Sequence, residues 1–127
     1  MIAAPVSITQ SDVRELQLAK AAVAAGIGIL LRRWGAAPTD VARLHMAGAF
    51  GNYVSRSSAR RIGLIPFPGD VVAASGNTAL LGAKLALFDE SAGFAAIRRR
   101  VEHVPLAADA RFQEIFVEEL AFPATAG

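Results

Sequence analysis

Two short apolar segments of this chain each end in a turn of small residues and then lead into a helical pattern. The first segment, 41–47, runs into the sequence GAFGNY, and the second, 70–74, runs into the sequence SGN. Strands that alternate with helices form parallel sheets, because right-handed crossovers bring each strand back beside the previous one. The order of segments therefore predicts an α/β fold, with a short, mostly parallel sheet flanked by helices.

The longest helical pattern lies before the first strand. Thr9 or Ser11 can cap its start, Asp12 places a negative charge in its first turn, and Gly35 supplies a left-handed stop. Apolar residues recur along it at three- and four-residue spacing, which predicts one buried face. The members of that face are Leu16, Ala19, Val23, Ile27, Leu30 and Trp34.

Further helices are predicted over residues 55–62, 77–88, 91–100 and 109–120. No internal repeat and no low-complexity linker divides the 127 residues, a length typical of one domain. We therefore expect a single domain over 1–127, with frayed ends at 1–8 and 123–127.

The chain is rich in apolar residues and poor in charge. Apolar residues make up 54% of the chain and charged residues 19%, whereas typical soluble domains carry about 25% charged residues. Two interpretations stay open at this point. An alanine-rich core accounts for the composition, and so does a surface made to be covered by another part of a protein.

Composition also excludes several classes of function. The chain has no cysteine, so it cannot itself hold an iron–sulfur cluster, and its two histidines are too isolated for a zinc site. The net charge is only +2, and the three arginines of 98–100 point in different directions on a helix, so no nucleic-acid partner is expected. The longest uncharged apolar run, 21–31, falls short of the roughly 20 residues that span a membrane. We expect a cytoplasmic location.

The two glycine turns are the candidate ligand site. In open α/β sheets ligands bind at the carboxyl ends of the strands, where glycine lets a phosphate or ribose approach the backbone. Gly48 and Gly51 follow one strand and Gly76 follows the other, but neither turn matches a Walker A loop or a dinucleotide fingerprint. On the pattern alone, nucleotide contact and ordinary turn geometry both remain possible interpretations.

Five blocks of residues, in this order, make the interpretation more specific. The blocks are 9–22, 46–53 (MAGAFGNY), 59–66 (ARRIGLIP), 76–84 (GNTALLGAK) and 112–117 (FQEIFV). Together they resemble the C-terminal region of reductive activators of corrinoid proteins, from about Ile8 to Pro123. The resemblance implies the fold of the actin, sugar-kinase and heat-shock ATPase superfamily, which is ribonuclease H-like. Members of the activator family couple ATP hydrolysis to the reduction of a Co(II) corrinoid.

The resemblance also assigns roles to residues of this chain. It implies that Met46 to Gly51 form the adenosine motif, with Ala49 where the superfamily often has a second glycine. The candidate nucleotide-binding residues within the motif are Gly48, Ala49, Phe50 and Gly51. The long first helix would lie beside adenine and ribose, which makes Glu15 and Lys20 candidate polar contacts, although the two could equally form ordinary helix-surface pairs. Gly76 and Asn77, at the start of the connecting helix, would complete the ATP- or ADP-binding residues.

The family's phosphate hairpins and Mg²⁺ ligands, and its ferredoxin-like [2Fe-2S] domain, have no counterpart in these residues. The resemblance therefore implies a nucleotide-binding segment that is inactive by itself, without catalytic or metal-binding residues of its own. Its expected partners are a corrinoid protein or corrinoid-dependent methyltransferase, and the remaining ATPase lobe or a second copy of the chain. The alternative is a non-enzymatic interaction module that docks on a corrinoid protein or methyltransferase, or associates with itself.

Several side chains outside the motif have two interpretations. His45 is expected to be packed or hydrogen-bonded rather than a ligand, and Trp34 and Tyr53 to be core or interface anchors. Arg60 and Arg61 form a solvated helix face, or else they face a phosphate or an acidic partner.

Overall fold

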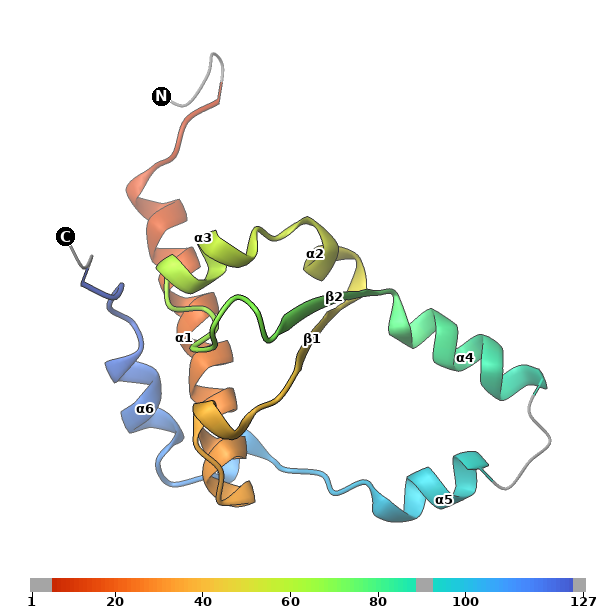
Figure 1. Cartoon of the computed structure of the whole chain (residues 1–127). Coiled ribbons are helices and arrows are strands. Elements are labelled where there is room, and N and C mark those ends of the chain that lie inside the picture. Colours follow the sequence, from red (N-terminus) through yellow and green to blue (C-terminus); the bar gives the residue numbers. More distant parts are fainter. Residues whose placement is uncertain (1–5, 89–92, 125–127) are drawn as a thin grey trace.

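A computed structural model describes residues 6–88 and 93–124 (Figure 1). The two strands are β1 (Leu44–Ala47) and β2 (Val72–Gly76). The helices are α1 (Gln10–Trp34), α2 (Gly48–Tyr53), α3 (Arg56–Arg61), α4 (Thr78–Phe88), α5 (Gly93–Arg100) and α6 (Phe112–Glu118), with short 3-10 turns at Pro38–Asp40 and Leu106–Ala108. The predicted alternation of helices and strands is confirmed, and residues 91 and 92 of one predicted helix lie outside the described residues.

The sheet consists of the two strands paired in parallel, as the sequence predicts. Leu44 pairs with Val72, and Ala47 pairs with Gly76, with an irregularity in the register between Met46 and Ala47. Strand β1 begins at Leu44 instead of residue 41 and ends at Ala47 as predicted, whereas β2 begins and ends later than the predicted segment 70–74. The whole segment 48–53, predicted as a turn, forms the short helix α2, which packs on both strands.

Local signals fix the two ends of α1. The hydroxyl of Thr9 accepts a hydrogen bond from the Asp12 backbone N–H at 3.3 Å, and the Asp12 carboxylate accepts one from the Thr9 backbone N–H at 2.7 Å. These reciprocal bonds form a capping box. Hydrogen bonding to Thr9, through its hydroxyl and then its backbone, lowers the pKa of the Asp12 carboxyl. At the other end Gly35 adopts the left-handed conformation, with φ of 72°.

The buried face of α1 differs from the predicted one. Leu16, Val23, Leu30 and Trp34 are all exposed, and Trp34 leaves 71% of its surface open. Small residues are buried in their place, together with one lysine; the buried residues are Lys20, Ala21, Ala24, Ala25, Gly26 and Ile29. The physical reason is close packing beside α6 and the 3-10 turn that precedes it. A Cβ added at Gly26 would lie 3.1 Å from Leu106, and one at Gly28 would lie 3.9 Å from Ile115.

The apolar core lies between α1, α3 and the sheet. Its buried members are Ala59, Ile65, Phe67 and Val72, and Ile27 and Leu31 of α1 pack against them together with Leu44 and Met46 of β1. Helices α4 and α5 stand apart from this core as an α4–α5 arm (Figure 1). Neither helix of the arm has a buried residue. Among the described residues, no helix is both long enough and apolar enough to cross a bilayer.

Candidate functional site

The predicted glycine turns meet at one edge of the sheet. Because Ala47 and Gly76 are paired, the carboxyl ends of β1 and β2 lie side by side, and Gly48 directly follows Ala47. Gly48 has φ of 86° and Gly76 has φ of 66°, a region that side chains rarely adopt. A Cβ at either position would have nothing within 4 Å. The space on the Cβ side of both glycines is therefore open.

Gly51 is a glycine for a different reason. A Cβ at this position would lie 3.1 Å from the carbonyl carbon and 3.2 Å from the carbonyl oxygen of Met46. Backbone atoms cannot move aside as a flexible side chain can, so only glycine lets α2 approach β1 this closely. Gly51 and Met46 also line a cavity of about 560 Å³, together with Val54 and Arg56.

Asn77 caps the helix that leaves this edge. Its Oδ1 accepts a hydrogen bond from the Leu80 backbone N–H at 3.0 Å, which fixes the start of α4. Next to it, His45 Nδ1 and Ser75 Oγ are 2.7 Å apart and join the two strands by a hydrogen bond. The predicted hydrogen-bonded role of His45 is confirmed. Ala49 and Phe50 belong to α2, but their side chains lie outside the described part of the structure.

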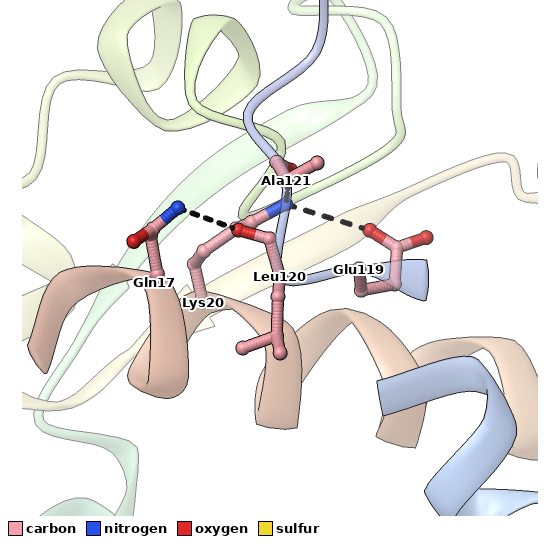
Figure 2. Close-up of polar contacts among 5 residues, drawn as sticks. All are labelled: Gln17, Lys20, Glu119, Leu120 and Ala121. Carbon is pink, nitrogen blue, oxygen red and sulfur yellow. Dashed lines mark hydrogen bonds and ion pairs between the residues drawn. The ribbon is translucent and has the colours of Figure 1, made fainter. Parts of the chain in front are cut away.

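Lys20 is engaged within the chain itself. Its side chain is 1% exposed, and its Nζ donates a hydrogen bond to the Ala121 carbonyl oxygen at 2.6 Å (Figure 2). Its Nζ also lies 3.7 Å from a carboxylate oxygen of Glu119, and Gln17 Nε2 donates to the Leu120 carbonyl oxygen at 3.1 Å. We call residues 119–124 the C-terminal strap, because these bonds hold the segment against α1.

The structure thus separates the predicted nucleotide residues into two groups. Gly48, Gly51, Gly76 and Asn77 lie together at the carboxyl edge of the sheet. Lys20 and the exposed Glu15 lie on α1, and Figure 1 shows the strands ending on the side away from that helix. Contact of Glu15 or Lys20 with a nucleotide stays a prediction.

Two features of this region cannot be predicted from local sequence patterns. Arg56 Nη1 donates a hydrogen bond to the Val72 carbonyl oxygen at 2.9 Å and so ties α3 to the start of β2. The C-terminal strap depends on bonds between residues about a hundred positions apart, such as Lys20 and Ala121. The described residues contain no group of three His, Asp or Glu side chains that could hold a metal ion.

Comparison with known proteins agrees with the fold and with the resemblance. The whole chain, residues 1–127, matches the family described as the C-terminal domain of RACo, the ASKHA domain, and the chain belongs to this family. Among curated proteins it is similar to the corrinoid activation enzyme RamQ of Eubacterium limosum, with 42% identity over 118 residues. The alignment covers 91% of this chain but only 20% of RamQ, so the chain spans about a fifth of this relative's length.

Proposed function

We propose that this chain is the C-terminal nucleotide-binding segment of an ATP-dependent reductive activator of corrinoid proteins. The observation that carries the proposal is the shared edge of β1 and β2, where Gly48 and Gly76 hold positive φ with open space around both. The likeness to a corrinoid activation enzyme supports the choice of reaction.

The residues of this edge suit the adenosine side of a nucleotide. The backbone at Gly48 and Gly76 can lie against a ribose or a phosphate without hindrance from a Cβ. Asn77 opens α4, whose first backbone N–H groups and positive dipole end favour an anionic or oxygen-rich ligand. Gly51 keeps α2 seated on β1, so it positions the edge and need not touch the ligand.

Bound ATP would supply the free energy for reduction of the corrinoid, and this chain would orient its adenosine end. In this proposal the phosphates and Mg²⁺ are held by residues outside 1–127, and so is the iron–sulfur cluster. The corrinoid protein or its methyltransferase is the partner of the whole activator. The remaining ATPase lobe, or a second copy of the chain, covers the exposed α4–α5 arm.

Isothermal titration with Mg·ADP and Mg·ATP tests the nucleotide site. We expect Gly48→Val to abolish binding, because valine is strained at a φ of 86° and its side chain fills the open space at the edge. Gly35→Val is the matched control, since Gly35 has φ of 72° and equally open surroundings but lies at the end of α1. The control variant should bind as the unaltered chain does.

The titration is run on the 127-residue chain and on a longer protein of the relative's length that contains it. Binding by the longer protein alone would show that other parts of the lobe complete the site. Absence of nucleotide binding in both folded proteins would contradict the proposal and favour the interaction module instead.

A further inference from the structure

A groove of about 1020 Å³ lies between α3 and the C-terminal strap. We call it the arginine groove, after the three arginines among its lining residues. Its lining includes Arg56, Arg60 and Arg61 from α3, Tyr53 from α2, and Pro123 and Ala124 from the strap.

The charge in this groove is of one sign. Its lining residues contain three arginines and no aspartate or glutamate. In the part of the chain that the structure describes, the ion pairs are Lys20–Glu119 and Arg33–Glu102, so neither Arg60 nor Arg61 has an acidic partner. Since the net charge of the chain is only +2, this groove is a local concentration of positive charge.

The wall opposite the arginines is held firmly in place. Lys20 and Gln17 bind the strap at Ala121 and Leu120, just before the residues that line the groove, Pro123 and Ala124. A Cβ added at Gly63 would lie 2.9 Å from Pro123 Cγ, so the strap sits directly on the end of α3. The groove is therefore formed before any partner arrives, and binding need not order its wall.

From these observations we infer that the arginine groove is a docking site for an acidic segment of a protein partner. The guanidinium group of arginine pairs with carboxylates through two parallel hydrogen bonds. A surface patch with charges of one sign also attracts partners of the opposite charge. Tyr53, 89% exposed beside the arginines, adds another residue type that is enriched where proteins bind proteins.

The chemistry of the groove favours a protein segment over a small molecule. Small-molecule sites are mostly apolar and enclose most of the ligand surface. Here the side chains of Arg56, Arg60 and Arg61 are all exposed, and the facing wall is an extended segment of chain. The inference does not rest on nucleotide binding, because Arg60 and Arg61 lie on α3 rather than at the carboxyl edge of β1 and β2.

The test measures binding of a fluorescein-labelled decaglutamate peptide by fluorescence anisotropy. We expect Arg60→Gln/Arg61→Gln to weaken binding about tenfold, and added sodium chloride to weaken binding by the unaltered chain. Arg98→Gln/Arg99→Gln is the matched control, with the same loss of two exposed charges from the last turn of α5. It should change the dissociation constant less than twofold.

Circular dichroism verifies the fold of each variant, and the single variant Arg60→Glu repeats the test should the double variant be unstable. Equal losses in the two double variants would overturn the inference, because binding would then follow net charge alone. So would the absence of peptide binding by the unaltered chain. Displacement of the peptide by inorganic phosphate, beyond the effect of sodium chloride at equal ionic strength, would show a phosphate site instead.

Discussion

Helix α1 buries one face against the rest of the chain, whereas helix α4 buries no residue. In α1 the buried residues are small, apart from Ile29 and a lysine, while several of its leucines stay exposed. Helix α4, with the sequence TALLGAKLALF, has one charged residue among eleven and buries none of them. Phe88 at its end is 85% exposed.

The difference shows that burial in this chain follows the partner and not the hydropathy of the helix. Helix α1 has α6 and the strap beside it, and small residues let these segments approach closely. Helix α4 has no such neighbour among the described residues and is apolar on every side. A helix that is apolar all round is normally buried, so the α4–α5 arm is a surface suited to being covered.

The largest expected effect comes from a substitution that disrupts the packing of the C-terminal strap on Gly63. Gly63→Ala should lower the free energy of unfolding by about 3 kcal/mol, because φ is 76° and the new Cβ would lie 2.9 Å from Pro123. Gly35→Ala shares the positive φ of 72° but has open surroundings, and should cost only about 1 kcal/mol. Urea unfolding followed by circular dichroism measures both, and equal losses would mean that the strap does not pack on Gly63.

A matched pair of lysines gives the next largest effect. Lys20→Met should cost about 2 kcal/mol, because it removes the charged donor that the buried Lys20 supplies to the Ala121 carbonyl oxygen. Lys84→Met removes an exposed lysine from α4 and should change stability by less than about 0.5 kcal/mol. Hydrogen exchange offers a second readout, since amides of the strap should lose protection in Lys20→Met alone. Similar behaviour of the two variants would contradict the anchoring role of Lys20.

Much of the fold could be predicted because its signals are local. Thr9 with Asp12 and the left-handed Gly35 mark the ends of α1, and Ser55 caps α3 as expected. The two glycine turns were predicted to follow parallel strands, and parallel pairing alone brings Gly48 and Gly76 to one edge. The strand limits were less accurate, since β1 pairs only from Leu44 onward and β2 pairs beyond its apolar run, as far as Gly76.

The rest depends on contacts that spacing cannot reveal. Periodicity identifies apolar residues of α1, but only the position of α6 decides that Ala25 and Gly26 face inward while Leu30 faces out. Lys20 shows the same limit at the candidate site. A lysine among the alanines and leucines of a helix gives no indication that its partner is a carbonyl 101 residues further along the chain.

The smallest expected effect concerns α4, in the α4–α5 arm. Leu85 of α4 is 55% exposed, so Leu85→Gln should change the free energy of unfolding of the dilute chain by less than about 0.5 kcal/mol. A loss of about 2 kcal/mol or more, as for a core leucine, would mean that α4 packs within the chain after all.

Repeating the unfolding at rising protein concentration distinguishes the two partners expected to cover the arm, a second copy of the chain and the remaining ATPase lobe. Association between copies makes the midpoint rise with concentration, and Leu85→Gln should remove that rise if a second copy covers α4. A midpoint independent of concentration would leave the remaining ATPase lobe as the cover.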